Sequence, residues 1–222
     1  MAHAHNTLIR AVNSCYNHAE LINYDQIPDY LLFSQTLFNT ISQLLRAEQD
    51  CIEPSLLDPY SEIPICYRKQ VPISQDPAFF GRFHAWANYV HDPVTRKDFS
   101  PDYMCALIIS FAPRLTQHLH ETVSSLARLT REGTLQSAPL TQRWAKINQI
   151  TANNLDPETD VVLLLGCQDK DFKVNGKVAA EEFPALCVTT SAKIKKWYSR
   201  QHRTAWRFCP SDFSGKRRTL PA

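Results

Sequence analysis

The chain has 222 residues, of which 44% are hydrophobic and 21% are charged, so it can bury a core and is not expected to be disordered. Its length suits one domain with appendages, or at most two small domains. The net charge of +2 gives no electrostatic reason to expect nucleic acid as a partner.

Apolar side chains at helical spacing predict four amphipathic helices in the first 132 residues. We expect these helices at residues 5–24, 29 or 30 to 50, about 77–91 and 101 to about 131. The last one has clear boundary signals, because Ser100 suits the N-cap, Pro101 the first turn and Gly133 the end. Pro113 is placed to kink it. Four such helices predict an all-α antiparallel four-helix bundle over residues 1–132.

The remaining segments are shorter. The proline-containing stretch 55–76 is expected to be an irregular connection. In the C-terminal extension, 133–222, we expect a short helix at 140–150, a β-like apolar run at 160–167 and a basic amphipathic helix at 191–202. These apolar pieces are too short to form a second core, so the extension is expected to pack on the bundle as a flank or a lid.

The compartment is predicted from several absences in the sequence. Residues 1–6 lack the basic and apolar regions of a signal peptide, and the longest apolar stretch, 161–165, is too short to span a bilayer. Seven cysteines without CxxC spacing suit reduced, buried thiols better than a disulfide framework. We therefore expect a cytoplasmic protein without a membrane span.

Three blocks of sequence stand out in combination: HNTLIR at 5–10, SFAPRLTQHLHE at 110–121 and WYSRQHRTAWRFCP at 197–210. Together they resemble the first helix, the last core helix and the C-terminal segment of fungal hemerythrin-like proteins, the HHE cation-binding family. The resemblance is spread along the whole chain. It implies that the predicted bundle is hemerythrin-like.

In that family, histidines and carboxylates on four helices hold two iron ions, so the resemblance implies a set of ligand positions. The positions that this chain keeps are His5, Glu48, His84 and His118. Leu44 and Phe80 stand where imidazoles are expected, and Thr122 stands where an acidic residue is expected. A diiron site that binds O2 reversibly is therefore not expected. The sequence indicates a hemerythrin-like domain with a degenerate metal site.

We favour a metal-independent pocket at the former iron site, with no cofactor, because leucine and phenylalanine enlarge its apolar surface. Glu48, His84 and His118 are the predicted acid–base groups. Other residues predicted to contact the substrate are His5, Tyr16, Phe38, Leu44, Arg46, Phe80, Phe83, Asn88, Arg114 and Thr122. Tyr16, Arg46, Asn88 and Arg114 also have a plainer interpretation, as a core aromatic or as surface polar groups. The plainer interpretation of the histidines and the glutamate is a relic of the metal site, held by mutual hydrogen bonds.

The resemblance associates the chain with fungal secondary metabolism. The predicted partner is a hydrophobic, oxygenated small molecule, and the predicted reaction is a dehydration, an isomerisation or a pericyclic cyclisation. Hetero-Diels–Alder addition to a quinone methide is one such cyclisation, which binding in the correct orientation would accelerate.

Two other functions stay open. One is a mononuclear iron protein in redox or metal sensing, with Glu48, His84, His118 and His5 as ligands. The other is a non-catalytic interaction protein whose exposed patch is the basic, aromatic segment 197–206. A homodimer also stays open.

The residues to which no function is assigned are predicted as follows. We expect His3, His18, His91 and His202 to be exposed or to lie in loops. The basic residues of the last thirty positions are interpreted as a solvated helix face, with a phosphate- or membrane-binding patch as the alternative.

Overall fold

The structure is a computed structural model that describes residues 1–51, 73–132, 137–174, 177–178, 183, 192–194 and 196–219. Its α-helices are α1 (Ala2–Ala19), α2 (Ile27–Cys51), α4 (Pro77–His91), α5 (Pro101–Arg131), α6 (Ser137–Asn154) and α7 (Asp160–Cys167). Single turns of 3-10 helix are η1 (Tyr24–Gln26), η3 (Ile73–Gln75), η4 (Pro93–Arg96), η5 (Tyr198–Arg200) and η6 (Ala205–Phe208).

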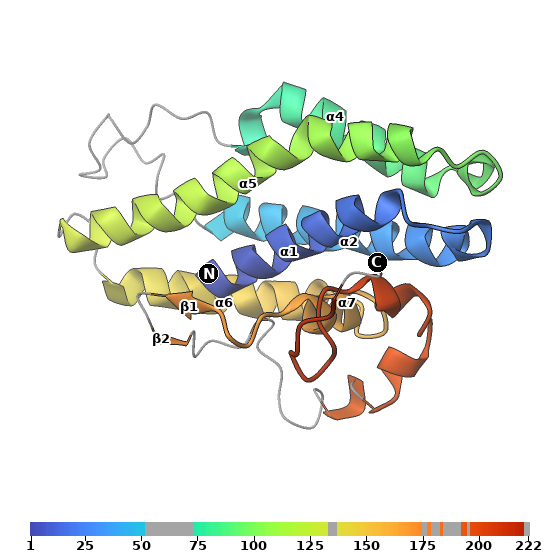
Figure 1. The fold of residues 1–222 in the computed structure, drawn as a ribbon. Helices are drawn as coiled ribbons and strands as arrows, with labels where there is room; N and C mark the ends of the chain where they lie inside the picture. The colour runs from blue at the N-terminus through green and yellow to red at the C-terminus, as the bar shows by residue number, and fades with distance from the viewer. Residues whose placement is uncertain are drawn as a thin grey trace.

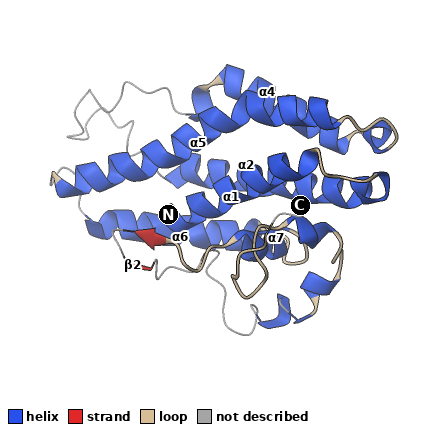
Figure 2. Cartoon of the chain, in the orientation of Figure 1, coloured by secondary structure: helices blue, strands red, loops and turns tan. Residues whose placement is uncertain are grey.

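Helices dominate the described chain, as Figure 2 shows. The only strands in the described ranges are the two-residue β1 (Lys173–Val174) and β2 (Lys177–Val178), which pair antiparallel. The all-α prediction is therefore confirmed. None of the described helices is both long and apolar enough to cross a membrane.

The helices form three layers in space (Figure 1). α4 and α5 pack together on one side, α1 and α2 lie in the middle, and α6 and α7 lie on the other side. α1 packs on α5, while α2 contacts both α4 and α6. α7 and η6 contact α1 and α2, so elements of the C-terminal third cover the middle layer.

Local capping explains where two helices begin. The Asp76 side chain accepts the Phe79 N–H at 3.0 Å, and Pro77 opens α4. In the same way, Ser100 accepts the Tyr103 N–H at 3.2 Å at the start of α5. The predicted boundaries of α4 and the start of α5 are confirmed.

Other predicted boundaries need correction. The first helix ends at Ala19, not at residue 24, because the chain turns back there: the Leu21 N–H donates to the His18 carbonyl, and η1 leads directly into α2. The helix predicted at 140–150 is longer, since α6 spans Ser137–Asn154. Residues 55–72 and Gly133 lie outside the described residues, and Ile73–Gln75 forms η3.

One buried aromatic core runs through the molecule. At the α4–α5 contact, the ring centroids of Phe111 lie 5.2 Å from Phe83 and 5.1 Å from Trp86. On the other side of α2, the Tyr30 ring meets Phe208 of η6 edge-to-face at 5.4 Å. Side chains from α1 to η6 thus belong to one hydrophobic cluster.

The β-strand predicted at 160–167 is wrong, because these residues form the helix α7. All eight are buried, so the run has no polar face and its sequence has no period that separates helix from strand. A helix satisfies its own backbone hydrogen bonds, as this buried position requires. The buried Asp160 carboxylate accepts the Asp156 N–H at 3.1 Å, and burial raises its pKa.

The basic helix predicted at 191–202 is also wrong over its last residues. Residues 192–194 and 196 are helical and η5 follows, but Gln201 is extended and His202 has a φ of +50°. The predicted aromatic patch is divided, because Trp197 is 59% exposed while Trp206 is 1% exposed and belongs to the core. The cysteines with described side chains, Cys15, Cys105, Cys167 and Cys209, are free and buried, as predicted.

Two glycines provide a matched test of this packing. An alanine Cβ at Gly166 would lie 2.5 Å from the Cys209 sulfur, whereas at Gly81 it would meet no atom within 4 Å. We expect Gly166→Ala to lower the free energy of unfolding by about 1–3 kcal/mol through overpacking. Gly81→Ala, inside a helix, should raise it by roughly 0.5–1 kcal/mol. Urea unfolding measures both, and equal effects would contradict the close contact between α7 and residue 209.

Candidate functional site

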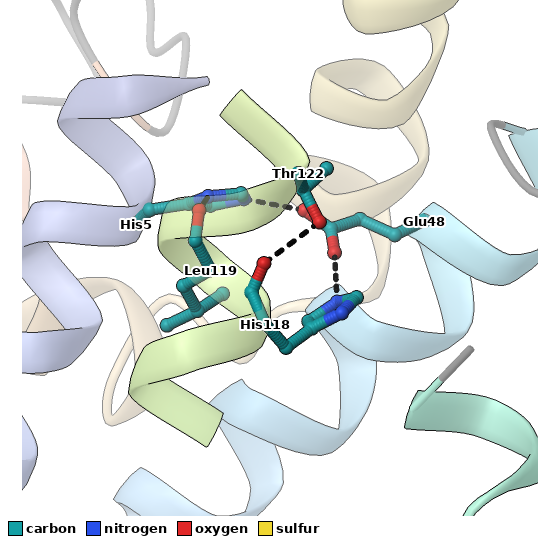
Figure 3. Close-up of polar contacts among 5 residues, drawn as sticks. All are labelled: His5, Glu48, His118, Leu119 and Thr122. Carbon is teal, nitrogen blue, oxygen red and sulfur yellow. Dashed lines mark hydrogen bonds and ion pairs between the residues drawn. The ribbon is translucent and has the colours of Figure 1, made fainter. Parts of the chain in front are cut away.

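A buried carboxylate on α2 joins histidines from two other helices (Figure 3). Glu48 Oε1 lies 2.5 Å from His5 Nε2, and Glu48 Oε2 lies 3.3 Å from His118 Nε2. The side chains of His5 and Glu48 are 3% and 5% exposed, and that of His118 is 16% exposed. The structure therefore brings together three of the four predicted ligand positions, on α1, α2 and α5.

The second nitrogen of His5 is also engaged. Its Nδ1 lies 2.7 Å from the Leu119 carbonyl oxygen, which can only accept a hydrogen bond. Nδ1 therefore donates, and Nε2 faces the Glu48 carboxylate, a second acceptor. His5 thus bridges the Leu119 carbonyl of α5 and the Glu48 carboxylate of α2 through its two ring nitrogens.

The electrostatics of Glu48 agree with this pairing. Burial opposes ionisation of the carboxyl, but the charge of His5 and the hydrogen bonds from His118 and His5 outweigh it, and they hold the pKa of Glu48 at about 2. Glu48 is therefore an anion at neutral pH. As it lies, it is a structural counter-ion between helices and offers no proton to a substrate.

Three other predicted substrate contacts are buried or already hydrogen-bonded. Leu44 is 1% exposed and belongs to the core. The Thr122 hydroxyl donates to the His118 carbonyl of its own helix at 2.9 Å (Figure 3). Phe83 is likewise buried, at 1% exposure. These three predicted substrate contacts therefore lie in or against packed protein.

His84 lies elsewhere, because of the helical period of α4. The buried positions of α4 are Phe79, Phe83, Trp86, Ala87 and Val90. A residue directly after Phe83 is rotated by about 100° from the core-facing side. His84 is accordingly exposed.

His84 lines a pocket of about 420 Å³ between α2 and α4, together with three other predicted contacts, Phe38, Arg46 and Asn88. Its imidazole has aromatic neighbours, with the Phe38 ring centroid at 5.9 Å and the Phe80 ring stacked at 6.0 Å. His91, to which we assign no function from sequence, also lines this pocket. The predicted acid–base set is thus divided between a buried cluster and an open pocket.

Two predicted contacts lie apart from both places. Tyr16 is 37% exposed and lines a separate hollow of about 310 Å³ beside Pro113. Arg114 pairs with Asp76, its Nε 3.1 Å from the carboxylate oxygen.

The iron site implied by the resemblance can be tested against these side chains. Within the described ranges, no group of three or more His, Cys, Asp or Glu side chains is placed to share one metal ion. His5 uses both ring nitrogens in hydrogen bonds, and His84 belongs to the other pocket. The residues as they lie do not fit an iron centre, and we derive no step through one.

Two histidines predicted to be exposed are buried. His3 is 8% exposed and His18 is 7% exposed, both on α1. His18 Nδ1 donates to the Ser14 carbonyl at 2.7 Å, and burial lowers its pKa. The prediction failed because the C-terminal elements cover a face of α1 that would otherwise meet solvent. His91 and His202 are exposed, as predicted.

Comparison with known proteins identifies the family. No family model matches the chain, and no solved structure matches it. The chain is 30% identical over 222 residues to the dimeric xanthone biosynthesis cluster protein R11 of Cryptosporiopsis sp. (strain 8999). The match covers 99% of this chain and 80% of that protein. The chain belongs to the family of protein R11.

The buried pair predicts an acid-dependent stability. The pKa of Glu48 is about 2 in the folded chain against an ordinary value of 4.5, so its contribution to the free energy of unfolding is complete above pH 4.5 and is lost as the pH falls toward 2. That contribution is about 3 kcal/mol. We expect Glu48→Gln to be less stable than the unmodified chain at pH 7, and this difference in unfolding free energy should close by about that amount near pH 2.

Urea unfolding at several pH values measures this difference. Glu132→Gln is the control, since the Glu132 side chain is 47% exposed. A difference between Glu48→Gln and the unmodified chain that does not change with pH would contradict the pairing.

Proposed function

We propose that the chain is a metal-independent enzyme of fungal secondary metabolism that acts on an oxygenated aromatic molecule in the α2–α4 pocket. The observation that carries the proposal is the grouping of an exposed imidazole, a guanidinium and an amide beside aromatic rings, in His84, Arg46, Asn88 and Phe38. Membership of the family of a xanthone biosynthesis cluster protein supports the substrate class, because xanthones are oxygenated aromatic compounds.

The pocket offers two kinds of recognition. Phe38 stands edge-on to both His84 and His91, with ring centroids 5.9 Å apart in each case, so a flat ligand finds aromatic edges and faces on both helices. Arg46 and Asn88 are exposed at the same pocket. Their N–H groups can bind phenol, carbonyl or carboxylate oxygens.

The chemistry assigned to this pocket is proton transfer. Imidazole exchanges a proton near neutral pH, so His84 is the proposed acid–base group. In a dehydration, protonated His84 would give its proton to a leaving hydroxyl, which departs as water as the C–O bond breaks. A phenol elsewhere on the substrate would release its proton to solvent water at the open pocket, which gives the quinone methide, and neutral His84 would take up a proton from solvent again. Arg46 would stabilise the negative charge that develops on the phenol oxygen. A later cyclisation would need only correct positioning.

The buried cluster has a different proposed role. We propose that α1, α2, α4 and α5 form the hemerythrin-like bundle and that His5, Glu48 and His118 occupy its former iron site. Their origin on three separate helices supports this. In this proposal the cluster positions the helices that carry the pocket, rather than touching the substrate. Iron binding, a non-catalytic interaction role and a cytoplasmic location stay predictions.

Turnover of oxygenated aromatic compounds tests the proposed enzyme. Hydroxybenzyl alcohols, hydroxyanthraquinones, benzophenones and xanthones would be incubated with the purified chain and followed by liquid chromatography–mass spectrometry. We expect His84→Ala to lower kcat/KM by about 10²–10⁴-fold, as loss of a general acid–base group does. Arg46→Ala should weaken binding of oxyanion-bearing substrates about tenfold or more.

His120→Ala is the matched control, because His120 is exposed on α5 and outside the pocket. Full activity of His84→Ala on a compound that the chain converts would exclude the assigned role.

Metal content tests independence from metal. Inductively coupled plasma mass spectrometry on untagged protein should find well below one metal ion per chain, also after incubation with ferrous iron. Turnover should not change with EDTA. Iron at one ion per chain that is lost in Glu48→Gln would instead support the iron alternative.

A further inference from the structure

A second pocket, of about 440 Å³, lies between α1 and the C-terminal segment 207–219. It shares no lining residue with the α2–α4 pocket. Its charged lining residues are Arg10, Arg207, Arg217, Arg218 and a single carboxylate, Asp169. The structure thus places the first and last of the three sequence blocks described above around one cavity.

Uncharged oxygen acceptors fix two of these guanidinium groups. Arg10 reaches out from α1 and donates to the Cys167 carbonyl at 3.0 Å and to the Ser211 hydroxyl at 2.8 Å. Arg218 donates to the Trp206 carbonyl at 2.7 Å. Carbonyl and hydroxyl acceptors orient a guanidinium without neutralising it. Both side chains are therefore held in place with their charge uncompensated by these bonds.

The single carboxylate does not balance the charge. Asp169 Oδ2 lies 2.7 Å from Arg217 Nη2, which pairs it with one arginine. Arg207 is exposed, and its guanidinium lies 5.1 Å from the Phe208 ring centroid. Among the described lining residues, positive charge is in clear excess.

An unused hydrogen-bond donor at the pocket also favours a ligand with oxygen acceptors. The side-chain nitrogen of Asn6, a lining residue, is buried and finds no hydrogen-bond partner within the described part of the chain. A buried donor without a partner costs about 1–3 kcal/mol, and a turn of the Asn6 amide toward a ligand oxygen in the pocket would offset this cost. The pocket therefore combines surplus cationic charge with an unused donor.

We propose that this pocket binds a small organic oxyanion, held by the arginines of α1 and of the C-terminal segment and by the Asn6 amide. Arginine forks match carboxylate and phosphate oxygens. A cavity of about 440 Å³ has the size of a small-molecule site. Arg10 and Asn6 are half-buried inside it, so an extended surface such as a membrane or a nucleic acid fits less well. The proposal does not depend on the chemistry at His84.

Isothermal titration calorimetry on the full chain tests the proposal with three probes: salicylate, salicylamide and inorganic phosphate. We expect salicylate to bind once per chain, more weakly as salt rises, and the uncharged salicylamide to bind at least tenfold more weakly. Tighter binding of phosphate than of salicylate would assign the site to a phosphate-bearing ligand. Failure of both anions to bind at millimolar concentration would overturn the proposal.

Two variants locate the binding. Arg207→Gln should weaken anion binding at least tenfold, whereas Arg200→Gln should not, because it removes the same charge from an exposed residue outside the pocket. Equal weakening by both would mean non-specific attraction and would overturn the proposal.

Asn6→Leu separates a binding role from a structural one. It removes the unpartnered donor with little change in volume, so the midpoint of thermal unfolding without ligand should stay the same or rise. Anion binding should weaken at the same time. A lower unfolding midpoint with unchanged binding would show that the amide serves the fold and not the ligand.

Discussion

The placement of α1, α2 and α5 relative to one another depends on one buried charge. Glu48 is an anion in the interior, and an unpaired carboxylate there would be strongly destabilising. Its two oxygens meet His5 and His118, which come from helices at opposite ends of the bundle sequence. A shift of α1 or α5 along α2 would draw one of these imidazoles away from it. Apolar contacts along these helices tolerate small shifts, so the hydrogen-bonded pairing adds a directional constraint on their register to its contribution to stability.

The sequence predicts the features that depend on neighbouring residues, such as helix starts. It does not predict the features that depend on packing against distant parts of the chain. Ser100 before Pro101 places the start of α5, because a cap acts within one turn. The uniformly apolar run 160–167 carries no such signal, and its helical state depends on burial against α1 and α2. His18 is buried because η6 covers it, with the Phe208 ring centroid 5.4 Å away. Nothing in the neighbourhood of His18 in sequence indicates this.

The candidate site shows the same division. The resemblance implied His5, Glu48 and His118 as neighbours, and the structure places them together. The resemblance does not predict where the His84 side chain points, because this depends on which residues of α4 face the core. Phe83 and Trp86 take those positions, so His84 turns outward to Arg46. The sequence also does not predict the positively charged pocket beside α1. Arg10 and Arg217 lie far apart in the sequence and line one pocket only in the folded chain.

The bonds between α1 and the C-terminal segment also set the order in which the protein can mature. Ser14 donates to the Phe208 carbonyl at 2.5 Å and Arg10 to the Ser211 hydroxyl, across 194 and 201 residues. A ribosome makes the chain from its N-terminus, so α1 emerges before these partners and meets them only when residues 205–211 have been synthesised. Until then one side of α1 lacks its cover. Contacts of such separation form slowly, so we expect the docking of residues 205–211 on α1 to be a late step of folding.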